Sequence, residues 1–134
     1  MGLQRLAPEG LFKPAAYTQV VVATGRRMVF VSGQVSMDAA GNLVAPGDVA
    51  GQARQVYANL RAALEGAGAG PADVVKLTTY VVGYKPELRG LLGEARATVF
   101  GPAALPASTL VGVQALADPG YLIEVEAIAV TDPA

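Results

Sequence analysis

The sequence contains no cysteine and no histidine, and these two absences exclude much of the chemistry that small enzymes commonly use. Without cysteine the chain has no disulfide, thiol nucleophile, thiolate zinc site or iron–sulfur ligand. Without histidine it has no imidazole base or imidazole metal ligand. Any acid or base must therefore be a carboxylate, a tyrosine, a lysine or a water molecule.

Basic charge is scarce and scattered. The formal net charge is -1, and the only adjacent basic residues are Arg26 and Arg27. This charge pattern does not favour binding to RNA or DNA. The glycine-rich sequences that bind dinucleotides or nucleoside triphosphates are also missing, so we expect no cofactor of that kind.

The hydrophobic runs do not suit a membrane helix. The longest uncharged run, residues 97–117, contains Gly101, Pro102, Pro106 and Gly112, which would break such a helix. The N-terminal residues have no apolar signal-peptide core. We therefore expect no membrane association and a cytoplasmic location.

The 134 residues predict a single domain over 1–134 that is large enough to form a real core. Hydrophobic residues make up 52% of the chain and charged residues only 16%. This balance predicts more apolar surface than a small monomer can bury alone, so self-association is expected.

Hydrophobic periodicity predicts an α+β domain with the element order β-β-α-β-α-β-β. Two right-handed strand–helix–strand crossovers would place both helices on the same face of one mixed sheet. The predicted elements, in chain order, are strands at 17–23 and 27–35 joined as a hairpin at 24–26, a helix capped by Asp48 and ended by Gly66 and Gly68, a strand at 75–82, a helix over 88–99, and two strands within 105–130 around Pro119-Gly120.

The last predicted strand carries two carboxylates inside an apolar run. Because strand side chains alternate between faces, Glu124 and Glu126 lie on the same face, about 7 Å apart. A carboxylate among aliphatic residues is costly unless it is paired or hydrated, so we expect at least one of them to line an interface or a pocket. Spacing alone equally allows two glutamates on a solvated strand end.

Four segments resemble the RidA/YjgF family of reactive-intermediate (imine) deaminases, and the match spans about residues 14–130. They are FVSGQV at 30–35, VAGQARQ at 49–55, VVKLTTYV at 74–81 and IEVEAIAV at 123–130. The resemblance implies a chorismate-mutase-like fold and a homotrimer with clefts between subunits. It also implies hydrolysis of enamine or imine intermediates to 2-keto acids and ammonia.

The same resemblance assigns roles to individual residues. Glu124 corresponds to the carboxylate that positions the hydrolytic water. Gly93 corresponds to a helix position that often carries an asparagine facing the cleft. The residues that the resemblance places around the substrate are Tyr17, Ser32, Gly33, Gly93, Ser108, Thr109 and Leu110.

The chain departs from the family pattern at Ser108, where active deaminases have an arginine that grips the substrate carboxylate. Losing this bond would cost about 2 to 5 kcal/mol of binding or rate, so weak activity on 2-imino acids is expected. Arg89 and Arg96 are expected to face away from the cleft, because their helix should pack on the opposite sheet face. Two functions therefore stay open: an imine or enamine hydrolase with an altered substrate, or a non-catalytic trimer that binds a small metabolite.

Overall fold

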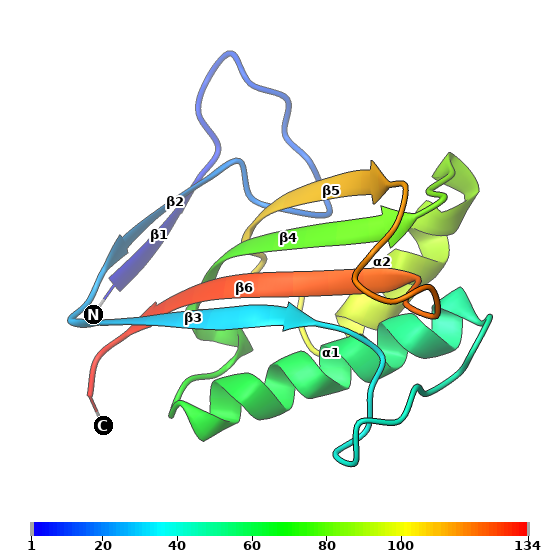
Figure 1. Cartoon of the computed structure of the whole chain (residues 1–134). Helices are drawn as coiled ribbons and strands as arrows, with labels where there is room; N and C mark the ends of the chain where they lie inside the picture. Colours follow the sequence, from blue (N-terminus) through cyan, green and yellow to red (C-terminus); the bar gives the residue numbers. More distant parts are fainter. Residues whose placement is uncertain (1, 134) are drawn as a thin grey trace.

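A computed structural model describes residues 2–133 of the chain (Figure 1). The elements are β1 (Gly2–Leu6), β2 (Val20–Thr24), β3 (Arg27–Gln34), α1 (Val49–Gly66), β4 (Val74–Val82), α2 (Arg89–Ala97), β5 (Ala107–Val113) and β6 (Ile123–Thr131), with short 3-10 turns at Pro71–Asp73 and Pro86–Leu88.

The central sheet is mixed and has the strand order β3-β6-β4-β5. β6 is antiparallel to both β3 and β4, whereas β4 and β5 are parallel. Both helices lie on the same side of this sheet, and the other side, here called the open face, has no helix over it (Figure 1). The predicted α+β class, with two helices on one face of a mixed sheet, is confirmed.

Helix α1 begins and ends where the sequence predicts. Asp48 is the N-cap, and its side chain accepts a hydrogen bond from the Gly51 amide at 3.0 Å. This bond satisfies one of the amides that the first helical turn leaves without a partner. The helix ends at Gly66, and Gly68 follows in the left-handed region at φ +73°, where glycine carries no steric penalty.

The core lies between the sheet and the two helices. Ile123 and Val125 of β6 are fully buried against this layer, as are Leu60 and Leu64 of α1. Burying such side chains contributes about 1.5 to 3 kcal/mol each. Since alternate side chains of β6 point into this core, Glu124 and the other residues between them project onto the open face.

The N-terminal part differs from the prediction. β1 was not predicted, and it pairs antiparallel with β2, with Gly2 opposite Thr24 and Leu6 opposite Val20. The predicted hairpin between the first two strands is therefore wrong: β2 pairs with β1, and β3 pairs with β6. The β1–β2 ribbon extends away from the central sheet (Figure 1).

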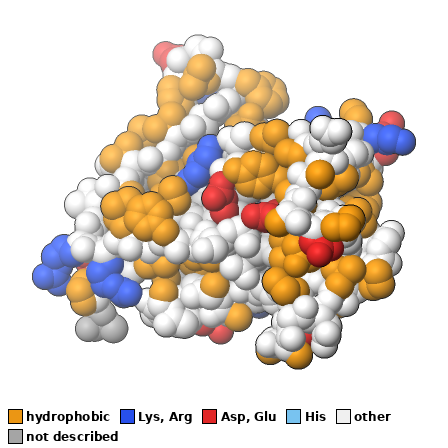
Figure 2. Space-filling model, in the orientation of Figure 1, with side chains coloured by type: hydrophobic (Ala, Val, Ile, Leu, Met, Phe, Trp, Pro, Cys, Tyr) orange, Lys and Arg blue, Asp and Glu red, His pale blue; other side chains and the backbone are white. Residues whose placement is uncertain are grey.

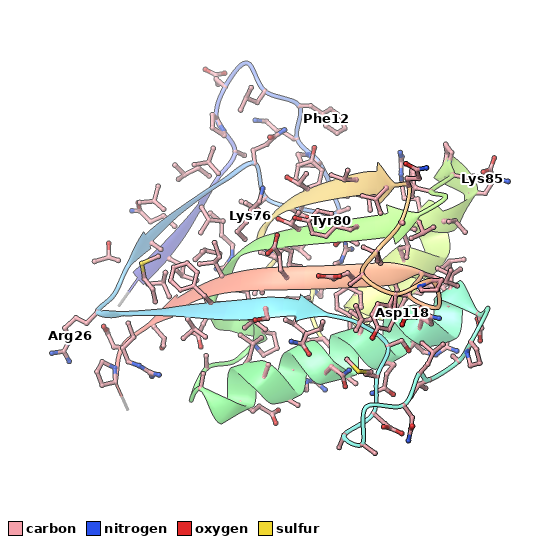
Figure 3. All side chains as sticks on the ribbon, in the orientation of Figure 1. Phe12, Arg26, Lys76, Tyr80, Lys85 and Asp118 are labelled. Atoms are coloured by element: carbon pink, nitrogen blue, oxygen red, sulfur yellow. The ribbon has the colours of Figure 1, made fainter. Side chains whose placement is uncertain are left out.

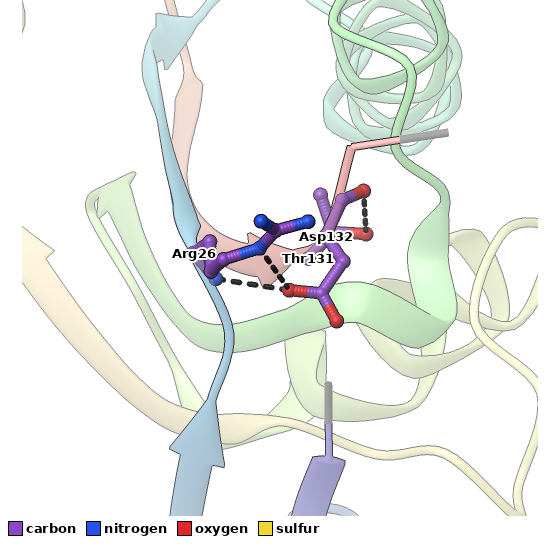
Figure 4. Close-up of polar contacts among 3 residues, drawn as sticks. All are labelled: Arg26, Thr131 and Asp132. Atoms are coloured by element: carbon purple, nitrogen blue, oxygen red, sulfur yellow. Dashed lines mark hydrogen bonds and ion pairs between the residues drawn. The ribbon is translucent and has the colours of Figure 1, made fainter.

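The connection between β2 and β3 is joined to the end of β6. Asp132 accepts a hydrogen bond from the Arg26 amide at 3.0 Å, and its Oδ1 lies 3.9 Å from the Arg26 Nε (Figure 4). This contact fixes the point where the ribbon leaves the central sheet. Among the described residues, neither helix has the length and apolar character that crossing a membrane requires.

Candidate functional site

Polar side chains gather in the middle of the open face. Glu124 and Glu126 project there from β6. Lys76 and Tyr80, which are labelled in Figure 3, project from the neighbouring strand β4. The space-filling view shows acidic and basic side chains close together on this face, with hydrophobic groups around them (Figure 2). The alternation along the last strand thus places both carboxylates where the sequence predicts.

Glu126 has a hydrogen-bond partner. The hydroxyl of Tyr80 donates to Oε1 of Glu126 at 2.6 Å. This hydrogen bond is the main cause that raises the pKa of Tyr80 above its ordinary value, and burial and the negative charges of both glutamates act in the same direction. One oxygen of Glu126 is therefore already occupied by a hydrogen bond between strands β4 and β6.

Glu124 lies against the backbone of Gly33. A Cβ atom at residue 33 would collide with Oε2 of Glu124 and would lie 2.6 Å from its Cδ, so only glycine leaves room for the carboxylate in this position. No described residue donates a hydrogen bond to this carboxylate. The oxygens of Glu124 are thus free to bind a water molecule. Oε1 of Glu126 is less available for water, because it already accepts a hydrogen bond from Tyr80.

A bulge in β3 brings Gly33 to this point. Val31 pairs with Ala127, but Gln34 pairs with Val125, so three steps along β3 correspond to two along β6. Such an insertion bends the strand and redirects its side chains. The serine and glycine that the family resemblance singles out are the two residues within this bulge.

Gln52 holds the turn that leads into β6. It is fully buried, and its Oε1 accepts a hydrogen bond from the Leu122 amide at 2.9 Å. Its Nε2 donates to the carbonyls of Gly120 at 3.0 Å and Ala45 at 3.3 Å. No role is predicted for this residue from the sequence, although a glutamine within an apolar helix stripe calls for buried partners.

A small pocket of about 280 Å³ opens on the open face. Ser32 and Glu126 line it together with Lys76 and Phe30, whose side chain is 68% exposed. The Lys76 ammonium donates a hydrogen bond to the Thr109 hydroxyl at 2.7 Å. Two of the predicted site residues, Ser32 and Thr109, therefore belong to the open face.

A larger pocket of about 640 Å³ lies on the helix side of the sheet, between α2, β5 and the loop before β2, and is here called the α2 pocket. It contains four predicted site residues. These are Tyr17, Gly93, Ser108 and Leu110. Other side chains that line it are Phe12, Tyr57, Thr79, Tyr84, Arg89, Leu92 and Arg96.

Helix α2 packs on the sheet face opposite Glu124, as expected, but Arg89 and Arg96 do not face away from the predicted substrate-binding residues, because both line the α2 pocket with Ser108. The parallel register explains why: Ser108 pairs with Leu77, whose side chain is buried on the helix side. Ser108 therefore points toward α2 and not toward the open face. Positions 89, 93 and 96 share one helix face, but helix spacing alone does not indicate which strand that face meets.

Burial and charge act in opposite directions on Tyr57, which lies at the floor of the α2 pocket and is 4% exposed. Burial raises the pKa of Tyr57, whereas its hydrogen bond with Thr79 and the positive charge of Arg96 lower it. The Arg96 guanidinium thus acts electrostatically within this pocket.

The predicted site residues of one chain form two groups on opposite faces of the sheet. Glu124, Gly33 and Ser32 lie on the open face, whereas Ser108 and Tyr17 lie in the α2 pocket. A single copy does not bring the predicted water-binding carboxylate to the predicted substrate-binding residues.

Known proteins with this fold share both sequence and topology with the chain. The family model described as Endoribonuclease L-PSP matches residues 10–131. The chain belongs to the RidA/YjgF/L-PSP family. A 2-iminobutanoate/2-iminopropanoate deaminase of Rattus norvegicus is 38% identical over 118 residues, which cover 88% of this chain and 82% of the rat protein. The enzyme of the same name from Mus musculus is 36% identical over 123 residues, covering 90% of this chain and 87% of the mouse protein.

Solved structures of RidA/YjgF/L-PSP proteins agree with the fold. YyfB from Yersinia pestis, described as a Rid family protein of unknown function, matches with a TM-score of 0.90 and 39% identity over 97% of this chain and 99% of its own. RidA from an Antarctic Psychrobacter matches with a TM-score of 0.68 and 27% identity over 95% of this chain and 98% of its own. The RidA family and the mixed-sheet fold that the motifs resemble are therefore confirmed.

Proposed function

We propose that this RidA family protein hydrolyses imine or enamine intermediates, with Glu124 as the residue that holds and activates the water. The observation that carries this proposal is the Glu124 carboxylate itself, which rests on Gly33 without a described hydrogen-bond donor. The deaminase relatives at 36% and 38% identity support the same reaction class.

The chemistry requires one residue to move a proton twice. Glu124 takes a proton from water as the water oxygen attacks the imine carbon, and it returns this proton to the nitrogen to complete a neutral carbinolamine. The carboxylate then takes the hydroxyl proton of the carbinolamine and delivers it to the nitrogen as the carbon–nitrogen bond breaks. Ammonia leaves, a carbonyl product remains and the carboxylate is restored, so the protons balance and no cofactor is needed.

We further propose that two copies of the chain build each site and that the assembly is a homotrimer. Within one copy the Glu124 carboxylate and Ser108 lie on opposite faces of the sheet, so Glu124 of the partner subunit would have to close the α2 pocket. Exposed apolar side chains on β3 favour such an interface, since Met28 is 62% and Phe30 68% exposed. Light scattering at micromolar concentration should give three times the monomer mass, whereas a stable monomer would contradict the shared site.

The function is tested by comparing Glu124→Gln with Glu126→Gln. Glutamine keeps the shape and hydrogen-bonding capacity of the side chain but removes its basicity. We expect Glu124→Gln to lower the turnover of a panel of imines by about 100- to 10,000-fold, with Glu126→Gln doing much less. Each variant should keep the mass of the wild-type assembly. Equal losses in both variants would show that the water-activating role does not belong to Glu124.

A non-catalytic, metabolite-binding trimer is the second candidate, and Ser108 is the observation that favours it. A serine at this position provides one hydroxyl and no charge where active relatives are expected to bind a carboxylate. If wild-type protein binds 2-keto acids but hydrolyses no imine, and neither glutamate variant changes binding, this second function holds in place of the first.

A further inference from the structure

The α2 pocket carries two positive charges without a negative one. Arg89 and Arg96 line it, and no aspartate or glutamate is among the described residues that form its wall. Neither arginine forms an ion pair with any carboxylate of residues 2–133. Arginines that face a pocket without an acidic partner are suited to an anionic ligand, because a guanidinium binds carboxylates through two parallel hydrogen bonds.

Arg96 is held in place and yet keeps free donors. Its Nη1 donates to the Ala16 carbonyl at 2.9 Å, which ties the guanidinium to the loop before β2. Its Nε is buried and has no partner, and the buried hydroxyl of Tyr84 on the same pocket wall also lacks one. Buried polar atoms without partners are costly, so both atoms indicate a polar ligand or water in this space. Arg89 is exposed and makes no described hydrogen bond, so it is the less fixed of the two.

Gly93 and Ser108 leave the room that such a ligand needs. Gly93 lies between the two arginines on the same helix face, and a Cβ atom there would meet nothing within 4 Å. Ser108 projects from β5 into the same pocket with a side chain much smaller than the arginine of the family pattern. Both positions therefore leave space for a ligand in the pocket that Arg96 lines.

We propose that Arg96 binds the substrate carboxylate in this protein, so that the cation of the site comes from helix α2 and not from strand β5. The inference rests on the proposed imine hydrolysis and places the carboxylate of the substrate beside helix α2. Tyr84 donates its unpartnered hydroxyl to the same anion.

Binding of a stable product measures this role without turnover. The probes are 2-oxobutanoate, which carries the carboxylate, and 2-oxobutanamide, its uncharged counterpart, and calorimetry or NMR titration gives each dissociation constant. We expect Arg96→Gln to weaken 2-oxobutanoate binding by at least about 10-fold while changing 2-oxobutanamide binding less than about 3-fold. Arg61→Gln is the matched control, because Arg61 lies on α1 and, among residues 2–133, its side chain bonds only to the Thr98 carbonyl, at 3.4 Å.

A double variant tests whether the guanidinium can move back to the strand. Ser108→Arg combined with Arg96→Gln should restore most of the 2-oxobutanoate affinity, and Arg96→Lys should keep more of it than Arg96→Gln because the charge remains. Circular dichroism and assembly mass show whether each variant folds. If Arg96→Gln does not fold, the binding constants of Arg96→Lys are compared with those of the wild type instead.

Three outcomes would overturn the proposal: unchanged 2-oxobutanoate binding in Arg96→Gln, equal weakening of both probes, or a larger loss in Arg89→Gln. These outcomes are independent of the test of Glu124. If the wild-type protein hydrolyses no imine while Arg96→Gln still loses the carboxylate probe selectively, the proposed reaction fails and the anion site stands.

Discussion

Replacing Gln52 should destabilise the protein far more than replacing a glutamine one turn away on the same helix. Gln52→Ala removes the partners of the Leu122 amide and the Gly120 carbonyl, which the fully buried side chain binds at 2.9 and 3.0 Å. A buried backbone group left without a partner costs about 1 to 3 kcal/mol. Two such groups predict a loss of about 2 to 6 kcal/mol, with the lower end if water enters the cavity. Gln55→Ala is the control, because the Gln55 side chain bonds only to Asn59 within the described part of the chain. This substitution should cost at most about 1 kcal/mol.

Urea denaturation at one fixed protein concentration measures the free energies of unfolding of these variants, since assembly would otherwise change them. Gln52→Met separates the hydrogen bonds from the cavity because methionine fills a similar volume without binding either backbone group. It should still lose about 1 to 4 kcal/mol, and the Leu122 amide should exchange its hydrogen faster than in the wild type. A Gln52→Met protein as stable as the wild type would refute the reasoning that this amide holds the turn before β6.

Two further predictions concern the open face. Gly33→Ala should leave the fold intact, since only the flexible end of Glu124 meets the new Cβ. The substitution should displace the carboxylate and lower any imine hydrolysis by about 100-fold in steady-state kinetics. Unchanged kinetics would mean that the position of the carboxylate is unimportant. Because the pKa of Tyr80 is raised, the hydrogen bond of its hydroxyl stabilises the fold below about pH 10 and is lost as the pH rises through the raised pKa. Glu126→Gln should bring the pKa of Tyr80 back toward its ordinary value. NMR titration of labelled tyrosine, with Tyr80→Phe for assignment, checks this shift, and an identical titration in Glu126→Gln would contradict its cause.

The sequence was sufficient to predict features that depend on local periodicity. The cap at Asp48, the end of α1 near Gly66 and the common face of Glu124 and Glu126 follow from spacing along one element, and the structure agrees at each. Parallel pairing of β4 and β5 also follows, because a helix between two strands of one sheet implies a crossover.

Features that depend on which elements meet could not be predicted in the same way. The two residues between Thr24 and Arg27 are as short as a hairpin turn, yet β2 pairs with β1, a five-residue strand whose composition gives little sign of one. The location of Arg96 depends on the side of the sheet that Ser108 faces, and this follows from the pairing of Ser108 with Leu77. Strand register across a crossover is a tertiary property, so periodicity along the helix identifies a face but not what that face meets.

The proposed role of Arg96 would replace, from helix α2, the guanidinium that the family pattern places at position 108. A carboxylate is recognised by a guanidinium at a point in space, and the backbone that supplies the guanidinium matters only through geometry. In this chain residues of strand β5 and of helix α2 line one pocket. Arginine on both elements would bring two like charges together, whereas Ser108 opposite Arg96, with glycine at position 93, avoids that repulsion and leaves space for the ligand. We therefore expect the effects of residues 93, 96 and 108 on carboxylate binding to depend on one another. Comparing the variants at Arg96 with the double variant at Ser108 and Arg96 measures this dependence.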